Sequence, residues 1–553
     1  MKIVASLCAF GKRNRSREKS MFNYLKRNRW RVLSVCALQI IVWGLQTVAQ
    51  LLLMKTFEGA IALDFSVFIF WTFMSLLCWA AYLGGGVFLG YVQVQTVRKL
   101  NNTVRSDMLQ GILSQRYQAY HKLDTGEHLS QLTSEVEQIE KLAWNPFFDC
   151  VGRCAQIIWS IIALCLIDWR LFAMSVFSAV LMWLLPKLFE KKMQTLGENN
   201  REAKATATAR LKELLHARDI LQLYGKEHAF MERGQTIGNN MEAMQCRLSV
   251  WQEISAGVLG IVSVGLQILG DVLIVILAIK GRIPIAVIAG GSNLIAGVTN
   301  GFSSVSGCRI SLITSKPYFE KIPQLEKQLP ESPLPEGGKS GEIPEIRLDK
   351  IGFSYDQETV LSNISMVFEP TKKYAIIGAS GSGKSTIMRL LLGWLDGYSG
   401  QIYINHSLAG EEYALQIRSY VSYVEQDVFL FCDTIRNNIC MGDDFSESEI
   451  QEAVKNSALD RDLSDFVLGL DTVIGENGAN LSGGQRQRIA IARALIRKRS
   501  IFLIDEGTSG LDQERAEIVE TNLLQNPNIT LIMISHHLTE ERKKKFDKIY
   551  ELD

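Results

Sequence analysis

The sequence carries almost no net charge. Its 59 Lys and Arg residues nearly balance its 58 Asp and Glu residues, which leaves +1 at pH 7. Proteins that bind nucleic acid through the phosphate backbone carry an excess of base, so we expect no nucleic-acid partner. Its ten Cys residues form no CxxC pair and no metal-ligand spacing. We therefore expect them to be small buried hydrophobes rather than metal ligands.

We also expect no secretory signal peptide. The segment before the first apolar run is long and charged, and no small-residue cleavage site follows a short apolar core. Apolar residues, by contrast, are abundant at 47% and crowd residues 32–308. Because a bilayer core needs ~20 apolar residues per helix, we predict an all-α transmembrane domain over 32–314. Its six expected spans are about 32–54, 65–92, 147–167, 171–186, 254–279 and 284–308.

Two of these spans are unusual. The fourth is short, and we expect its helix to continue past Pro186. The sixth, "PIAVIAGGSNLIAGVTNGFSSVSG", is the weakest by hydropathy because it is rich in Gly, Ser and Asn. Small residues of this kind suit close helix packing or the wall of a cavity.

The charges around the first span predict the orientation. Residues 12–31 hold nine Lys or Arg against one Glu, and the positive-inside rule places such a segment in the cytoplasm. The basic N-terminal region 1–31 is then cytoplasmic, with either a solvated tail or an amphipathic elbow helix near 20–27. Six spans put both termini and the two long linkers, 93–146 and 187–253, inside. Structureless loops of this length are rare, so we expect helices that extend the spans into the cytoplasm.

Few charged residues fall within the spans. Asp149 and Arg153 lie four residues apart, share a helix face and can pair, whereas Asp271 has no obvious local partner. Ionisable residues inside a membrane suggest function, so these three are candidates for the substrate pathway. Structural interhelical pairing is the alternative. The aromatic residues of the second span either line an apolar cavity or face lipid.

The composition changes after the last span. Residues 315–344 hold six of the eleven Pro and read as a linker, and alternating strands and helices follow from 345 to 553. Within "YAIIGASGSGKSTIMRLLLG", residues 378–385 fit G-x-x-x-x-G-K-[ST] between a strand and a helix. This is the P-loop of α/β nucleotide-binding domains: backbone N–H groups wrap the phosphates, a Lys reaches their oxygens and a hydroxyl binds Mg²⁺. The candidate ATP-binding residues are Gly378, Ser380, Gly381, Gly383, Lys384, Ser385 and Thr386.

A second strand, "SIFLIDE", ends in two carboxylates. Asp505 is placed at the strand end, where it can join the Mg²⁺ shell. Glu506, next in the chain, is the better candidate to orient or deprotonate the attacking water. With the P-loop upstream, this strand indicates an ATPase with ATP and Mg²⁺ as its cofactors.

One further motif points to a family. "LSGGQ" at 481–485 resembles the signature of ABC (ATP-binding cassette) transporters, and residues 345–553 resemble their nucleotide-binding domain over nearly its whole length. The resemblance implies roles for Tyr355 as the aromatic residue that stacks on adenine and for Gln426 as the Q-loop residue that senses Mg²⁺. It likewise implies Asp512 in the D-loop and His536 as the switch histidine at the γ-phosphate. The implied catalytic set is Glu506, His536 and Gln426, and the implied Mg²⁺ set is Ser385, Gln426 and Asp505.

The resemblance also implies a dimer. In the family, the signature residues of one domain, here Ser482, Gly483, Gly484 and Gln485, face the P-loop of another. Six spans ahead of one such domain resemble an ABC exporter half-transporter, with coupling helices expected near 114–122 and 214–223. A homodimer is favoured because the motifs are intact, and a heterodimer is the alternative.

The expected protein is thus an integral membrane ATPase of the bacterial cytoplasmic membrane. It would export a peptide, an amphipathic drug or a lipid by alternating access, with membrane lipid as its surroundings. An importer built on the exporter fold, such as a metallophore uptake system, and a regulatory membrane ATPase without pumped cargo are the alternatives.

Overall fold

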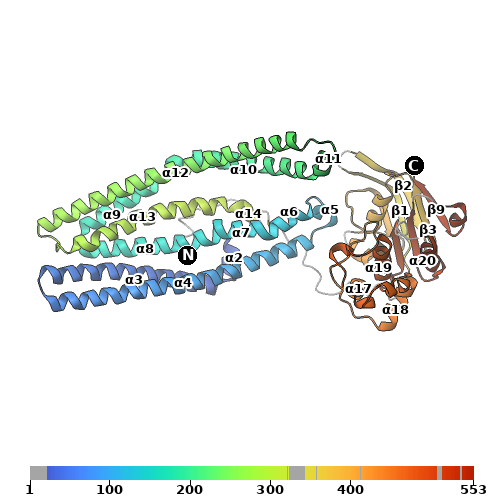
Figure 1. Cartoon of the computed structure of the whole chain (residues 1–553), viewed down its shortest axis with the longest axis horizontal. Coiled ribbons are helices and arrows are strands. Elements are labelled where there is room, and N and C mark those ends of the chain that lie inside the picture. The colour runs from blue at the N-terminus through green and yellow to red at the C-terminus, as the bar shows by residue number, and fades with distance from the viewer. Residues whose placement is uncertain are drawn as a thin grey trace. The chain divides into compact units, whose positions relative to one another are not determined.

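The structure is a computed structural model that describes residues 21–320, 322, 343–355, 358–410, 413–506, 513–535 and 538–552. The chain divides into two compact units. The first is helical and consists of residues 1–112 and 125–324; the second consists of residues 113–124 and 325–553 and contains two β-sheets. Figure 1 shows the helices of the first unit and the strands and helices of the second.

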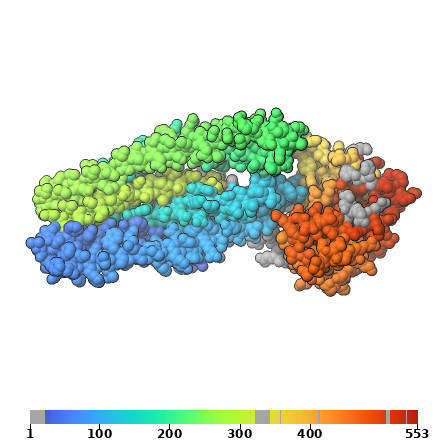
Figure 2. Space-filling view, viewed as in Figure 1, coloured from blue at the N-terminus to red at the C-terminus, as the bar shows by residue number. Residues whose placement is uncertain are grey.

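The helical unit is built from long rods. Its α-helices are α2 (Met21–Arg27), α3 (Arg29–Ile61), α4 (Phe65–Leu113), α6 (Thr125–Ser130), α7 (Val136–Ile139), α8 (Asn145–Ile167), α9 (Trp169–Leu184), α10 (Lys187–His216), α11 (Arg218–Leu223), α12 (Glu227–Ile279), α13 (Val287–Thr314) and α14 (Lys316–Glu320). At 1.5 Å per residue, the 49 residues of α4 and the 53 of α12 span roughly 70–80 Å. This is more than twice the ~30 Å of a bilayer core, so the long linkers are indeed helical extensions. The α10 and α12 extensions lie side by side and form a continuous strip of surface in the space-filling view (Figure 2).

Five stretches of helix among the described residues are long and apolar enough to cross a membrane. They are Arg29–Ile61, Phe65–Leu113, Thr125–Ile167, Trp169–His216 and Glu227–Ile279. The fourth stretch continues past Pro186, as its sequence predicts. The predicted sixth span corresponds to α13, which forms a 28-residue helix but is not among the five. Its small residues serve packing: a Cβ on Gly301 would lie 2.6 Å from the Ile157 side chain of α8.

The N-terminal helix α2 is tied to the helical unit. Met21, Tyr24 and Leu25 on one face are buried, and Arg27 forms a 2.8 Å ion pair with Asp107 of α4. The ring of Tyr24 packs against Trp144 and Phe319 at centroid distances of 6.5 and 6.2 Å. The segment predicted as an elbow helix or a solvated tail is therefore a helix with a buried face.

The stretch that leads into α8 is not a uniform α-helix. Two π-helical turns, η1 (Gln131–Glu135) and η2 (Glu140–Trp144), interrupt it on either side of α7. A π-turn bonds each N–H five residues back rather than four, appears mostly as a single turn and is frequent at functional sites. Trp144 at the end of η2 is fully buried and donates to Asn101 of α4 at 3.0 Å.

The second unit has an antiparallel and a parallel sheet. The antiparallel sheet has the order β2 (Glu358–Phe368), β1 (Ile346–Tyr355), β4 (Ser399–Ile404), β5 (Ser407–Leu408). The parallel sheet has the order β6 (Val421–Val424), β7 (Ile501–Asp505), β8 (Thr530–Ser535), β3 (Lys373–Gly378), β9 (Lys548–Leu552). Strands β3, β7 and β8 are short apolar runs buried on both faces, as expected for parallel strands.

Helices cover these sheets. The α-helices of this unit are α5 (Tyr117–Tyr120), α15 (Lys384–Leu391), α16 (Tyr413–Tyr420), α17 (Ile435–Cys440), α18 (Glu447–Asn456), α19 (Gly483–Leu495), α20 (Gln513–Gln525) and α21 (Glu540–Lys543). Helices α17, α18 and α19 share a separate apolar cluster that includes Ile439, Val454 and Ile489. The second unit therefore has its own helical subdomain beside the sheets.

The parallel sheet brings the predicted site together. The carboxyl ends of β3, β6, β7 and β8 lie at one edge because the strands are parallel. The P-loop follows β3, Gln426 follows β6 and Glu506 follows β7. Segments up to about 130 residues apart in the chain thus converge by topology.

Candidate functional site

The P-loop connects β3 to α15 and is folded around its own lysine. Lys384 is 5% exposed, and its Nζ donates to the carbonyls of Gly378 at 2.9 Å and Ala379 at 2.6 Å. Gly383 precedes the helix at φ +89°, and a Cβ there would come within 2.5 Å of Leu361. Only glycine fits such a position. Ser380 and Gly381 are exposed at the turn, whereas Thr386 is buried in the first turn of α15.

Asp505 ends strand β7 beside the P-loop. It is 5% exposed, and burial raises the pKa of its carboxyl group, although a hydrogen bond with Ser385 lowers it. Its Oδ1 is buried without a hydrogen-bond partner. A buried carboxylate oxygen of this kind, next to a hydroxyl, fits a hard divalent cation that takes oxygen ligands. The residues present are therefore compatible with the Mg²⁺ expected from the sequence.

Glu506 lies where the Q-loop and the signature helix meet. Gln426 donates its Nε2 to Glu506 Oε2 at 2.9 Å, and Gln487 of α19 donates to the Glu506 backbone carbonyl at 3.3 Å. The backbone of Glu506 is left-handed, at φ +53°, which is uncommon for a residue other than glycine. Such strained positions cluster at functional sites. Gln487 has no motif that would have singled it out; its signal is its place two residues after the signature.

Tyr355, the candidate adenine-stacking residue, ends strand β1. Its ring is 39% exposed and packs edge-on against Phe353 with centroids 4.9 Å apart. Its hydroxyl accepts a hydrogen bond from Arg389 of α15 at 3.2 Å. Arg389, which sequence reasoning did not identify, thus links the helix of the P-loop to the aromatic residue and fixes the edge of the ring.

The signature forms a capped helix N-terminus. Ser482 Oγ accepts from the Gln485 N–H at 3.2 Å, and the Ser482 N–H donates to Gln485 Oε1 at 2.9 Å. This capping box satisfies two donors and starts α19. Ser482 and Gly483 are exposed, so the N–H groups of Gly483 and Gly484 face outward at the positive end of the helix dipole. Such an end binds phosphate without a lysine.

A buried ion cluster ties the signature helix to the rest of the domain. Asp462 is 1% exposed and accepts from Arg488 of α19 at 2.5 Å and from Arg515 of α20 at 2.7 Å. Removing one partner of a buried pair strands the other charge at a cost of about 3–5 kcal/mol. The sequence gives no sign of this cluster, because its three members lie in separate segments.

The segment 113–124 is the first expected coupling tip, and its contacts lie in the second unit. Tyr117 stacks on Trp394 with centroids 4.5 Å apart and an interplanar angle of 9°. Arg116 forms a 2.8 Å ion pair with Asp396, and Gln118 donates to the Asp396 carbonyl. Trp394 in turn meets Tyr423 of β6, three residues before Gln426. The segment therefore packs next to β6, the strand that precedes the Q-loop glutamine Gln426.

Five other predicted residues do not take part in the site described above: two lie outside the described residues, and three belong to the helical unit. Asp512 and His536 lie outside the described residues. In the helical unit, Asp271 of α12 accepts a 2.6 Å hydrogen bond from Ser292 of α13, a partner that the sequence did not reveal.

Arg153 does not pair with Asp149 in the described structure: it donates to Gln156 at 3.1 Å and lies over the Trp43 ring. Helical spacing placed the two charges on one face but could not show that a neighbouring helix offers Arg153 an aromatic partner.

Comparison with known proteins agrees with this geometry. Residues 22–301 match the sequence profile of the family described as ABC transporter transmembrane region, and residues 361–509 match that described as ABC transporter. The ATP-dependent lipid A-core flippase of Haemophilus influenzae is 30% identical over 462 residues, covering 80% of this chain and 76% of the relative. That of Photobacterium profundum is 28% identical over 440 residues, covering 76% and 73%.

A solved structure shares the fold. "Structure of a bacterial Atm1-family ABC exporter with ATP bound" superposes with a TM-score of 0.82, at 21% identity, over 95% of this chain and 93% of the other. The two family matches and the relatives show an ATP-binding, membrane-spanning exporter whose ATPase activity is coupled to transport. The chain therefore belongs to the ABC transporter family, as a half-transporter in which one transmembrane region precedes one nucleotide-binding domain.

Proposed function

We propose that two copies of this chain form a homodimer that exports a lipid across the bacterial cytoplasmic membrane, with both termini in the cytoplasm. Two ATP molecules would be hydrolysed between the two nucleotide-binding domains. The basic N-terminal region supports this orientation, and the relatives named lipid A-core flippases support a lipid cargo over a peptide or a drug.

The exposed N-terminus of α19 is the observation that supports the dimer. Ser482 and Gly483 are exposed, and no hydrogen bond joins 481–485 to the P-loop within the described residues. An anion-binding helix end without a phosphate site opposite it in the same chain needs a second chain. Since this chain has both an intact P-loop and an intact signature, two-fold symmetry would build two complete sites from identical copies.

The chemistry of each site follows from its residues. Lys384 would exchange the carbonyls of Gly378 and Ala379 for phosphate oxygens. Ser385, Asp505 and Gln426 would hold Mg²⁺, which supplies positive charge to the phosphates when it is bound. Glu506 would accept the proton of the water that attacks the γ-phosphorus. The signature amides of the other copy would stabilise the negative charge on the γ-phosphate oxygens.

Closure of the two domains on ATP would drive the transport step. Segment 113–124 docks beside β6 through Tyr117 and Trp394, so a movement of the Q-loop strand would reach the helices that continue from that segment. Lipid and ATP would influence each other only through different affinities for the inward- and outward-facing states.

Lipid translocation in proteoliposomes tests this function. Purified protein would be reconstituted with a trace of fluorescent phospholipid, and ATP added to the outside. We expect ATP to increase the rate at which labelled lipid becomes inaccessible to dithionite, and Glu506→Gln to abolish that increase. ATP hydrolysis without any ATP-dependent lipid movement, in liposomes where the protein is active, would contradict a lipid exporter.

A further inference from the structure

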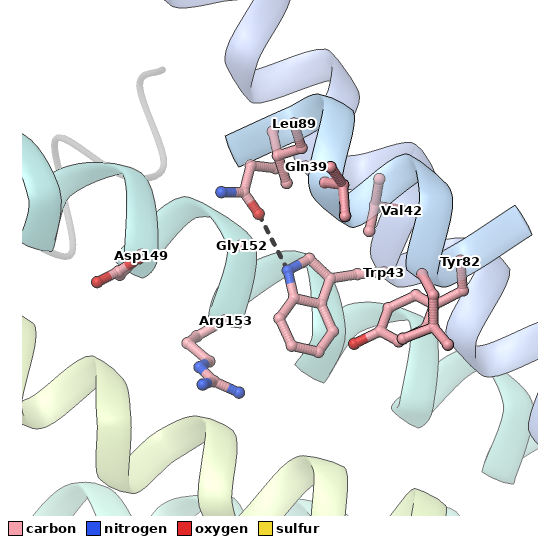
Figure 3. Close-up of a pocket in the computed structure, with 11 residues that line it drawn as sticks. Gln39, Val42, Trp43, Tyr82, Leu89, Asp149, Gly152 and Arg153 are labelled. Atoms are coloured by element: carbon pink, nitrogen blue, oxygen red, sulfur yellow. Dashed lines mark hydrogen bonds between the residues drawn. The ribbon is translucent and has the colours of Figure 1, made fainter. Parts of the chain in front are cut away.

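A cavity of about 440 Å³ lies among α3, α4 and α8 of the helical unit (Figure 3). All of its lining residues belong to the first three predicted spans. One part of its wall is apolar and includes Val42, Leu83 and Val87, whereas Asp149 and Arg153 of α8 line another part. A largely apolar cavity with a few polar groups is the usual form of a binding site for an amphipathic molecule.

The cation in this cavity is held by a chain of side-chain contacts. The Arg153 guanidinium lies 5.1 Å from the centre of the Trp43 ring. Trp43 Nε1 donates to Gln39 Oε1 at 3.0 Å, and Gln39 donates to Gln93 of α4 at 3.4 Å. The ring is thereby fixed from two helices, as Figure 3 shows for Gln39 and Trp43.

Gly152 makes this arrangement possible. A Cβ at this position would collide with Gln39 Oε1 and would lie 2.7 Å from Trp43 Nε1. Any larger residue would therefore push Gln39 and Trp43 away from α8. The contact explains why a glycine precedes Arg153.

Both charges in the cavity lack a counter-charge at contact distance. Neither Arg153 nor Asp149 forms an ion pair in the described part of the chain, although they lie within electrostatic range of each other. A cation–π contact stabilises the guanidinium without neutralising it, and Gln156 accepts from only one of its five N–H donors. Ionisable residues within a membrane-spanning stretch are costly, and by default they suggest a functional site.

From these opposite charges we infer a binding site for a zwitterionic phospholipid headgroup. The phosphate would bind Arg153 and the ammonium group would bind Asp149, with the acyl chains along the apolar wall. This inference rests on the proposed function, since it identifies the chemistry of the lipid that the exporter takes. A purely anionic headgroup would satisfy Arg153 but would be repelled by Asp149. The apolar wall favours a lipid over the free headgroup.

Native mass spectrometry of the detergent-purified chain without ATP tests this site. The probes are dioleoyl-phosphatidylethanolamine, dioleoyl-phosphatidylglycerol, diacylglycerol and free phosphoethanolamine. We expect phosphatidylethanolamine to bind at least tenfold more tightly than the other three. Arg153→Gln and Asp149→Asn should each weaken its binding at least fivefold.

A matched pair of glycine variants tests the location. Gly86 lines the cavity and Gly90, one turn further along α4, does not; a Cβ on either meets nothing within 4 Å. Gly86→Phe should weaken phosphatidylethanolamine binding at least fivefold, and Gly90→Phe should leave it within twofold.

Three outcomes would overturn the site. Tighter binding of phosphatidylglycerol to Asp149→Asn together with unchanged phosphatidylethanolamine binding would show a simple anion site. Equal binding of the free headgroup would show a small-molecule site, and insensitivity to both charge variants would show that the lipids bind elsewhere. Because binding is measured without ATP, loss of this site would leave ATP-driven lipid transport to be judged separately in proteoliposomes.

Discussion

The nucleotide-binding domain contains two helix N-termini suited to phosphate, and they are built in opposite ways. At α15, the helix begins after a left-handed glycine, Gly383, without a capping side chain, and Lys384 donates to the carbonyls of the P-loop. At α19, the capping box of Ser482 and Gln485 is complete, and the helix end is exposed. The first end must exchange an internal contact for a ligand, whereas the second is ready before any ligand arrives.

This difference indicates what each end contributes. A loop that rearranges around a cation can enclose a nucleotide tightly, so the P-loop should dominate ATP affinity. A rigid, capped end offers fixed amide dipoles, which stabilise charge that develops during the reaction. The signature should therefore affect turnover more than binding, and variants of the two ends should separate these quantities.

The largest effect is expected for Lys384→Ala. The substitution removes the cation proposed to bind the phosphates, so both ATP binding and hydrolysis should fall, hydrolysis by at least 100-fold. Fluorescent-nucleotide titration and a steady-state ATPase assay measure the two. Lys372→Ala, which removes an exposed lysine paired with Asp547, is the control and should change neither more than twofold. If Lys384→Ala still bound ATP as tightly as the wild type, the P-loop would not dominate ATP affinity, and the proposed difference between the two helix ends would be wrong.

Ser482→Arg should separate binding from turnover. The large side chain would block the exposed end of α19 and remove its cap, while the P-loop is untouched. Turnover should drop to background with ATP affinity within about threefold of the wild type. Unchanged turnover would mean that the signature does not close on nucleotide. The same two assays apply, with Ser448→Arg on α18 as a surface control.

Glu506→Gln is expected to lower hydrolysis at least tenfold while ATP still binds. The amide keeps the contact with Gln426 at 2.9 Å geometrically possible but cannot accept the proton of the attacking water. Single-turnover measurement of phosphate release tests the chemical step itself. Near-normal release would reject Glu506 as the base. Glu541→Gln, an exposed residue far along the chain, serves as the control.

Gln485→Ala should have an intermediate effect. It removes half of the capping box and leaves the Ser482 N–H without its acceptor, which costs about 1 kcal/mol of helix stability. We expect a fall in the melting temperature and a three- to fivefold loss of turnover, with Gln485→Glu restoring both because Glu also completes a capping box. If Gln485→Glu were as slow as Gln485→Ala, the amide would have a role other than capping.

The smallest effect is expected for Arg389→Met. Loss of the hydrogen bond to the Tyr355 hydroxyl would free one edge of the ring, so the apparent KM for ATP should rise about two- to threefold with kcat nearly unchanged. Tyr355→Phe, which removes the same bond from the other side, should match it. A fall in kcat with unchanged KM would place Arg389 in the chemistry rather than at the ring.

Local motifs predicted much of this molecule. The P-loop, the strand that ends in Asp505 and the capped signature each occupy a few adjacent residues, so their spacing alone indicates their geometry. Apolar runs likewise predicted the long helices. The sixth span was harder to predict from hydropathy. Helix α13 packs closely against α8 through small residues such as glycine and serine, and these residues lower the mean hydropathy by which a span is identified.

Contacts between distant segments could not be predicted. Arg116 meets Asp396 across 280 residues, and Asp462 gathers arginines from two helices. Each partner is unremarkable in its own stretch of sequence, and only the folded arrangement makes the pair meaningful. Arg153 shows the same limit, since its aromatic partner belongs to α3.

The two π-turns before α8 have a consequence for that helix. A π-turn accommodates one residue more than the α-helical turn it replaces. Each residue advances an α-helix by about 100°, but η1 and η2 each absorb one extra residue locally, so α8 keeps the direction in which it presents its side chains. Deleting one residue within η1 is therefore expected to restore an α-helical turn and to leave Asp149 and Arg153 at the cavity. The stretch before α8 can thus change in length by one residue without moving these two charges.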